Sequence, residues 1–203
     1  SYVHFDRGRA SSGTMSNIVC LPDRECVLPK LKYSDPDMDF AGWATYSDGL
    51  PVFHDQQVVY DLNEMDEKDV TLYAKWLRKY KVHFDSNGAT SGNMNDIICD
   101  ENVNCTLPNN SYQKTGYGFA GWATSATGDV TYQNGSSPVD ITEGTNVTLY
   151  AVWKRPYTIH YNGNGATSGS MADTICLQDI PCTVRTNTFE KTGYFYGGWA
   201  TSS

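Results

Sequence analysis

Residues 119–124 read Phe-Ala-Gly-Trp-Ala-Thr, and almost the same six residues occur twice more in the chain. They stand as Phe-Ala-Gly-Trp-Ala-Thr at residues 40–45 and as Tyr-Gly-Gly-Trp-Ala-Thr at residues 196–201. The tryptophans of successive copies are 79 and then 77 residues apart. A fixed period of this length indicates a tandem-repeat protein, in which each unit repeats one supersecondary fold.

Other residue types keep the same step along the chain. The cysteines form three pairs of equal spacing, which are Cys20 with Cys26, Cys99 with Cys105, and Cys176 with Cys182. The recurring histidines are His4, His83 and His160. The segment Val-Thr-Leu-Tyr-Ala-x-Trp occurs at residues 70–76 and 147–153, and no third copy precedes Ser203. The sequence therefore predicts repeats at residues 1–79 and 80–156 and an incomplete repeat at residues 157–203.

Alternation of apolar and polar residues predicts strands at both ends of each unit. Residues 80–85 and 157–161 place an apolar side chain at every second position, and so do residues 147–153. Three shorter apolar segments lie between the ends, at residues 97–99, 105–107 and 117–122. Within the last of these, Gly121 is expected to mark a bulge or a close backbone approach.

The pattern predicts a small β-rich repeat with at most one short helix per unit. We place that helix at residues 92–96 or 137–141, because no segment shows a long 3.6-residue period. Only residues 77–79 and 154–156 separate successive units. Linkers this short favour a semi-rigid string of units.

The second unit carries four motifs in order, Asn-Gly-Ala-Thr, Thr-Leu-Pro, Gly-Tyr-x-Phe-x-Gly-Trp and Val-Thr-Leu-Tyr-Ala-x-Trp. This series resembles the internalin B-repeat, also called the Listeria-Bacteroides repeat. The first unit departs from it at Arg9 and at Asp37-Met38, which replaces Gly-Tyr. The resemblance implies a small α+β module of β-grasp, ubiquitin-like type, repeated in tandem in an extracellular stalk or adhesin.

Composition excludes several classes of protein. The chain has 203 residues and a formal net charge of −8. Its aromatic content of 13% is too high for a disordered chain. The longest apolar run is residues 149–153, whereas a bilayer span takes about 20 residues. We therefore expect no membrane span in residues 1–203, and the first residues predict no signal peptide. Without a basic run, nucleic acid is not an expected partner.

The cysteine pairs are the strongest chemical signal. Equal spacing with no cysteine left over predicts a disulfide within each pair, closing a local loop. The alternatives are six free thiols in a reducing compartment or a zinc site, although structural zinc sites usually show a two-residue cysteine spacing.

The recurring histidines alternate with apolar residues, so we expect them on an exposed strand face rather than in a pH sensor or a metal site. No serine or cysteine nucleophile with an adjacent base recurs in the three units. We expect no catalytic residue, no metal and no cofactor, and therefore no enzyme.

Two acidic clusters occur in the first unit alone. They are Asp35, Asp37 and Asp39, and then Glu64, Asp66, Glu67 and Asp69. Alternate carboxylates are suitable calcium ligands. Lys114-Thr115-Gly116 and Lys191-Thr192-Gly193 replace the first cluster in later units, so solvated loops are favoured.

The aromatic residues have either a core or a recognition role. We expect the tryptophans to form the cores, because rings that recur in every unit of a small module usually do so. These are Trp43, Trp76, Trp122, Trp153 and Trp199. Tyr73 and Tyr150 lie on the opposite strand face and are the candidate surface contacts.

The function expected from these features is a non-catalytic repeat region of a bacterial cell-surface protein, acting as a disulfide-pinned stalk, spacer or adhesin. Two alternatives are a stretch of an extracellular filament subunit and a glycan-binding module. The expected location is extracellular, at the cell surface. The expected partners are a protein or glycan of a host or neighbouring cell, or a second copy that associates through the incomplete third repeat.

Overall fold

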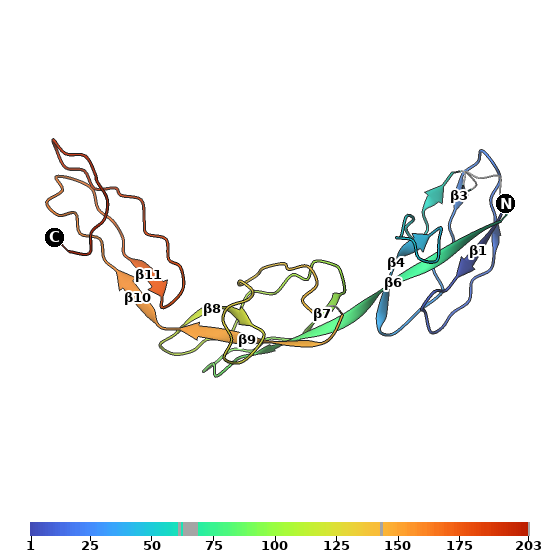
Figure 1. Ribbon diagram of the computed structural model, residues 1–203, viewed down its shortest axis with the longest axis horizontal. Helices are drawn as coiled ribbons and strands as arrows, with labels where there is room; N and C mark the ends of the chain where they lie inside the picture. The colour runs from blue at the N-terminus through green and yellow to red at the C-terminus, as the bar shows by residue number, and fades with distance from the viewer. Residues whose placement is uncertain (61, 63–68, 143, 203) are drawn as a thin grey trace. The chain divides into compact units, whose positions relative to one another are not determined.

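The computed structural model describes residues 1–60, 62, 69–142 and 144–202, and every regular element in these ranges is a β-strand (Figure 1). The strands are β1 (Tyr2–Asp6), β2 (Ile18–Val19), β3 (Cys26–Val27), β4 (Met38–Ala44), β5 (Val58–Val59), β6 (Asp69–Asp85), β7 (Ile97–Asp100), β8 (Gly118–Ala123), β9 (Val147–Lys154), β10 (Pro156–Ile159) and β11 (Thr174–Leu177). The mainly β class is thus confirmed, and residues 92–96 and 137–141 contain no helix. The β-grasp classification stays a prediction.

The chain forms two compact units, each built from three segments. The first comprises Ser1–His83, Asp96–Thr106 and Ser137–Val147, and the second comprises Phe84–Asn95, Leu107–Ser136 and Thr148–Ser203. The boundary between the units therefore passes through the predicted second repeat. That the three sequence repeats are also independently folding domains stays a prediction.

In the first unit, β1 is held on both sides. It pairs antiparallel with β2, where Val3 faces Ile18, and parallel with β6, where Val3 faces Val70. Strand β4 pairs antiparallel with β6, from Met38 opposite Arg78 to Ala44 opposite Tyr73. The alternating residues of these strands put Val3 and Leu72 in the core, where neither is exposed.

Strand β6 runs without interruption through the predicted boundary at residues 79 and 80 (Figure 1). The Lys79 amide donates to the Asp37 carbonyl at 2.9 Å, and the Arg78 carbonyl accepts from the Glu101 amide at 2.9 Å. Because successive residues of a strand point their backbone groups to opposite edges, β4 and β7 lie on opposite sides of β6 here. Residues 77–79 are therefore part of a paired strand and not a linker loop.

Both complete repeats contain the bulge predicted at Gly121. The register shifts between Phe119 and Gly121 in the β8–β9 pair and at the equivalent position, Gly42, in the β4–β6 pair. Gly121 has a φ of +143°, and a Cβ there would lie 2.7 Å from the Tyr132 carbonyl oxygen. The glycine therefore provides both the bulge and the close approach, which L side chains do not tolerate.

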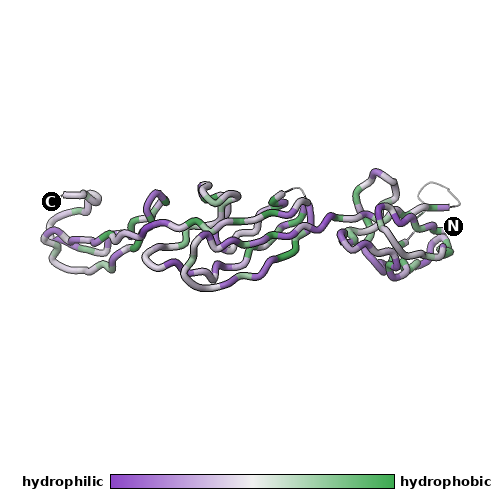
Figure 2. The backbone as a smooth tube through the Cα atoms, turned by 90° about the horizontal axis from the view of Figure 1, so that it is seen from below, coloured by the Kyte–Doolittle hydropathy of each residue, from purple (hydrophilic) through white to green (hydrophobic). Residues whose placement is uncertain are grey.

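Each complete repeat has one fully buried tryptophan at the centre of its core. Trp43 packs edge-on against Phe5 and Phe40, with ring centroids 5.1 Å apart in both pairs. Trp122 lies 4.9 Å from the rings of Phe84 and Phe119. Figure 2 shows hydrophobic and hydrophilic residues interspersed along the backbone, as expected for strands that bury one face.

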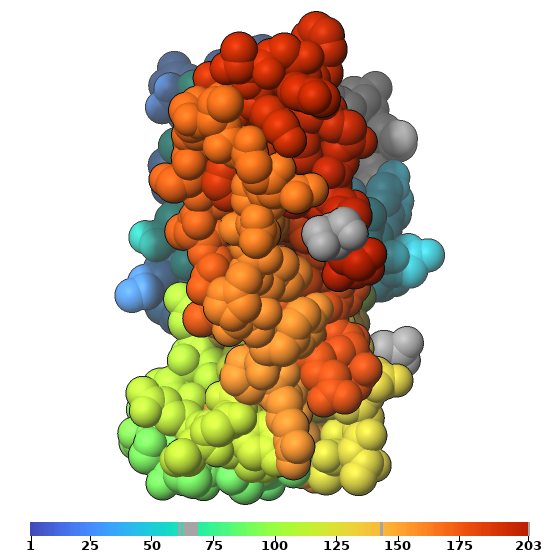
Figure 3. All heavy atoms as spheres, turned by 90° about the vertical axis from the view of Figure 1, so that its left-hand side faces the viewer, coloured from blue at the N-terminus to red at the C-terminus, as the bar shows by residue number. Residues whose placement is uncertain are grey.

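The other tryptophans are less buried. Trp76 and Trp153 are half-buried, and their indole N–H groups donate to the carbonyls of Arg7 and Ser86, both at 2.9 Å. Trp199 is 36% exposed, which differs from the core role expected for it. Its segment is seen in red in Figure 3. Among residues 157–202, no strand pairs with this segment in the way that β9 pairs with β8.

The predicted apolar segment at residues 105–107 is not a strand. It is nevertheless held by backbone hydrogen bonds, because the Cys105 amide donates to the Pro138 carbonyl at 2.8 Å and the Leu107 amide to the Ser136 carbonyl at 2.9 Å. Both Cys105 and Leu107 are buried. No helix in the part of the chain that the structure describes is long and apolar enough to cross a bilayer.

Candidate functional site

Three disulfides close the loops that follow the edge strands β2, β7 and β11. They join Cys20 to Cys26, Cys99 to Cys105 and Cys176 to Cys182, with Cα atoms 5.5, 5.5 and 5.7 Å apart. Each pairing is the local one that the spacing predicted. A loop of this size is worth about 2 kcal/mol in the chain-entropy model of disulfide stabilisation. The bridges therefore stabilise each module modestly.

Two of the recurring histidines are exposed, and both have acidic partners that the sequence analysis missed, whereas His4 is half-buried. His83 Nδ1 lies 2.6 Å from Asp96 Oδ1, and His160 Nδ1 lies 2.8 Å from Asp173 Oδ2. Hydrogen bonds from His83 and Lys81 hold the pKa of Asp96 below its ordinary value. The equal spacing of the two His–Asp pairs in the sequence was the available signal. Across the described ranges, no three His, Cys, Asp or Glu side chains gather as a metal site.

The first acidic cluster is divided between a turn and a strand junction. The Asp37 amide donates to Asp35 Oδ1 at 2.9 Å, which closes a local turn. Asp39 instead accepts from Lys79 Nζ at 2.6 Å. In the second cluster, Glu64, Asp66 and Glu67 lie outside the described residues, and Asp69 begins β6.

The candidate surface tyrosines each lie beside a bulged strand. Tyr73 faces Ala44 across the β4–β6 pair, and Tyr150 faces Ala123 across the β8–β9 pair. Both side chains are half-buried. Their role in surface contact stays a prediction.

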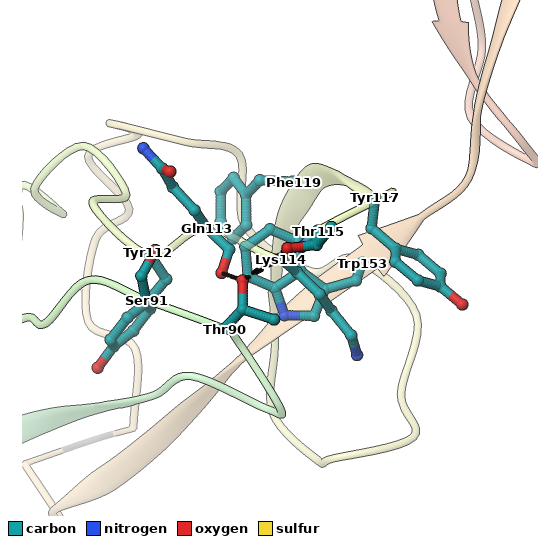
Figure 4. A pocket seen from close by; sticks show the side chains of 9 residues that line it. All are labelled: Thr90, Ser91, Tyr112, Gln113, Lys114, Thr115, Tyr117, Phe119 and Trp153. Atoms are coloured by element: carbon teal, nitrogen blue, oxygen red, sulfur yellow. Dashed lines mark hydrogen bonds between the residues drawn. The ribbon is translucent and has the colours of Figure 1, made fainter.

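A pocket that the sequence analysis did not identify lies in the second unit (Figure 4). It has a volume of about 430 Å³, and its lining consists of Thr90, Ser91, Tyr112, Gln113, Lys114, Thr115, Tyr117, Phe119 and Trp153. Loop residues 90–91 and 112–117 form its rim, while β8 and β9 contribute Phe119 and Trp153. The Phe119 and Trp153 rings meet edge-on at 5.7 Å.

Hydrogen bonds between the two loops fix the rim. The Thr90 hydroxyl donates to the Gln113 carbonyl at 3.1 Å and accepts from the Thr115 amide at 3.2 Å. Ser91 and Gln113 exchange backbone hydrogen bonds at 3.2 and 2.9 Å. The rim is thus preorganised by the Thr90 hydroxyl and by backbone groups, which leaves the side chains of Ser91 and Gln113 out of these hydrogen bonds.

Positive charge gathers on one side of this pocket. Lys114 Nζ lies 5.1 Å from the centre of the Tyr117 ring and 3.5 Å from the Asn87 carbonyl oxygen. The Arg155 guanidinium lies 6.0 Å from the same ring. Neither cation forms an ion pair with a carboxylate of the described residues.

The contact between the lysine and the tyrosine recurs in the third repeat but not in the first. Lys191 Nζ lies 5.0 Å from the Tyr194 ring and 3.3 Å from the Asn164 carbonyl oxygen. The first repeat has Asp35 and Met38 where the second has Lys114 and Tyr117. The recurrence of Lys-Thr-Gly-Tyr at residues 114–117 and 191–194 was a signal that sequence reasoning could have used.

Comparison with known proteins gives two findings. The family model of the Listeria-Bacteroides repeat domain matches residues 80–152 and 157–203. A Gly-rich membrane protein of Evansella cellulosilytica is 32% identical over 178 residues, which cover 79% of this chain and 19% of that relative. The chain therefore spans about a fifth of the length of the relative it matches.

Proposed function

This chain belongs to the Listeria-Bacteroides repeat domain family, and from that premise we propose that it is a non-catalytic repeat region of a bacterial cell-surface protein, acting as a disulfide-pinned stalk, spacer or adhesin. The observation that carries the proposal is the disulfide in every repeat. Structural disulfides persist in oxidising, extracellular environments and are rare in the cytosol. The membrane protein named among its relatives supports the same location.

The continuity of β6 supports a spacer role in particular. One strand closes the sheet of the first repeat and pairs with β7 of the second, so rotation at this junction would break backbone hydrogen bonds. The absence of catalysis is proposed from the sequence, in which no nucleophile and base recur.

Surface digestion tests the location. Protease applied to intact cells that make the longer parent protein should release peptides from residues 1–203, while a cytoplasmic marker stays intact. The control is the same digestion after lysis, which should degrade the marker. Protection of this region on intact cells, with all six cysteines open to alkylation without reductant, would contradict the proposal.

A glycan-binding module is the second candidate, and the pocket at Thr90 and Lys114 favours it. Binding pockets have volumes of about 300–1,000 Å³ and combine apolar walls with a few placed polar groups. A glycan array separates the two functions, because a pure spacer gives no hits and a glycan-binding module gives a related set.

A further inference from the structure

The lining of the pocket combines two chemical surfaces. Its rim presents the exposed side chains of Ser91, Gln113 and Thr115, and its base is formed by the half-buried rings of Phe119 and Trp153. A sugar ring has hydroxyl groups on its edge and C–H groups on its face. Hydroxyl and amide side chains suit the edge, and an aromatic ring suits the face.

The polar groups on the rim keep hydrogen-bonding capacity that other residues of the protein do not satisfy. The Gln113 side-chain amide has no partner among the described residues, although its backbone is held from both sides by Ser91 and by Thr90. Lys114 has three N–H donors, of which one is directed at Asn87. A rim already held in place loses less conformational entropy when a ligand binds.

The local charge then selects among saccharides. The whole chain carries a net charge of −8, yet Lys114 and Arg155 both lie near the Tyr117 ring without a carboxylate partner among the described residues. An anionic group that reaches Lys114 therefore displaces no ion pair of the described residues, and the nearby Asp85 carboxylate is held by the Asn87 amide at 2.7 Å. A charge-assisted hydrogen bond of this kind is about twice as strong as a neutral one.

From this geometry we infer that the pocket of the second repeat binds an anionic saccharide, with Lys114 contacting its acidic group and Phe119 and Trp153 forming the base beneath its ring. This deepens the glycan-binding candidate of the proposed function and does not depend on the spacer role. The third repeat places Glu190 at the position of Gln113, and its carboxylate accepts from the Ser168 hydroxyl at 3.3 Å. That negative charge opposes an anionic ligand, so the second repeat is the preferred site.

The inference is tested on the whole chain by amide NMR with three probes. These are trigalacturonic acid, its fully methyl-esterified form, which keeps the sugar skeleton without charge, and inorganic phosphate. Trigalacturonic acid should cause saturable shifts across residues 113–119 and at Trp153. The ester should bind at least about tenfold more weakly, because it lacks the charge-assisted bond. Phosphate should shift Lys114 without moving Phe119 or Trp153.

Matched variants locate the interaction. Lys114→Gln and Lys75→Gln each remove one positive charge, but Lys75 donates to the Ser47 carbonyl in the first repeat. The first variant should weaken binding about tenfold and the second should not change it. Lys114→Arg should retain most of the affinity. Gln113→Glu, which copies a residue tolerated in the third repeat, should also weaken binding about tenfold and serves if Lys114→Gln fails to fold.

Several results would overturn the inference. They are the absence of saturable shifts in residues 113–119, equal binding of the acid and its ester, a phosphate response that reproduces the full saccharide pattern, or equal loss in the Lys75 and Lys114 variants. None of these results would affect the proposed location at the cell surface, which the surface digestion tests separately.

Discussion

Lys79 Nζ lies 2.6 Å from Asp39 Oδ1 and so ties the middle of β6 to β4. Asp100 of β7 is the strand partner of Lys79 on the other edge. The pKa of Lys79 is raised by its hydrogen bond with Asp39, and the pKa of Asp100 is raised by burial and by the charge of Asp39. Asp39 thus forms an ion pair with Lys79, while Asp100 is near enough for the charges of both to shift its pKa, where the first two predicted repeats meet.

The second junction is built from different residues. Pro156, Gly118 and Leu177 occupy the positions of Lys79, Asp39 and Asp100, and the Leu177 side chain packs over Gly118. At these three positions a polar contact is therefore replaced by an apolar one, while Lys154 Nζ and Asp179 Oδ2 form an ion pair at 3.5 Å beside the second junction. Leu177 carries no charge where Asp100 places a partly buried carboxyl, so the two junctions should respond differently to pH.

Replacing Asp100 by asparagine should stabilise the protein at pH 7, by up to about 1 kcal/mol, because it removes a partly buried charge beside Asp39. A carboxyl whose folded pKa is raised costs stability when ionised, so the contribution of Asp100 to stability should rise as pH falls through its raised folded pKa towards the ordinary value of 3.8. Asp100→Asn should lack this gain. Urea unfolding at pH 7 and at pH 4, close to the ordinary pKa of the carboxyl, measures both effects. Asp129→Asn, in an exposed loop, is the control, and an equal response of the two variants would contradict the assignment.

Substituting Gly121 by alanine should destabilise the second repeat by about 2–4 kcal/mol, because the new methyl group meets the Tyr132 carbonyl and the Val130 side chain in addition to the unfavourable φ. Gly116→Ala is the matched control, since its φ of +79° is also unfavourable but nothing lies within 4 Å of the added Cβ. Its expected cost is about 1 kcal/mol. Thermal unfolding compares them, and equal losses would show that backbone strain alone accounts for the effect at Gly121.

Peptide mapping without reductant should recover each disulfide within one short peptide. Removing the second bridge through Cys99→Ser with Cys105→Ser should cost about 2 kcal/mol and leave the strand pairing intact. Denaturant unfolding of this variant beside the wild type measures the loss. Peptides that link cysteines from different repeats would refute the local pairing.

Residues 80–156 should fold alone, since they carry one set of strands, one disulfide and the core around Trp122. The isolated segment should melt in one cooperative transition. Residues 69–156, which restore the whole of β6, form the comparison. A broad transition for the first segment and a sharp one for the second would show that the strand cannot be divided at residue 79.

The third repeat should accept a strand with the sequence of residues 147–153. The same segment lies in β6 of the first repeat, where it pairs parallel with β1, and in β9 of the second, where it pairs antiparallel with β8. A peptide of this sequence can therefore pair in either way with the third repeat. The peptide should raise amide-exchange protection at β10 and at residues 196–200 and reduce the exposure of Trp199. A scrambled peptide is the control. If the chain self-associates through this edge, the peptide should also lower its apparent mass in solution.

Much of the architecture was predictable because the repeat supplied its own comparison. Strands at residues 80–85 and 147–153 were expected from alternation, and residues 97–99 and 117–122 were marked as short apolar segments; β6, β7, β8 and β9 include or closely match these four ranges. The bulge at Gly121 was also expected, because a glycine inside a strand often marks a bulge or a place where another backbone comes close. The local disulfides followed from cysteine spacing.

Other features depend on residues that are distant in the sequence. Residues 77–79 were interpreted as a short linker, because alternation does not mark them as a strand. Their pairing with β4 and β7 instead makes them part of one continuous strand. The pocket likewise joins Thr90, Lys114 and Trp153, which no local pattern connects. Periodicity shows which face of a segment is buried, because the residues on that face recur at regular positions along the sequence. Strand partners and pocket walls arise from backbone hydrogen bonding and packing between segments, so they exist only once the chain has folded.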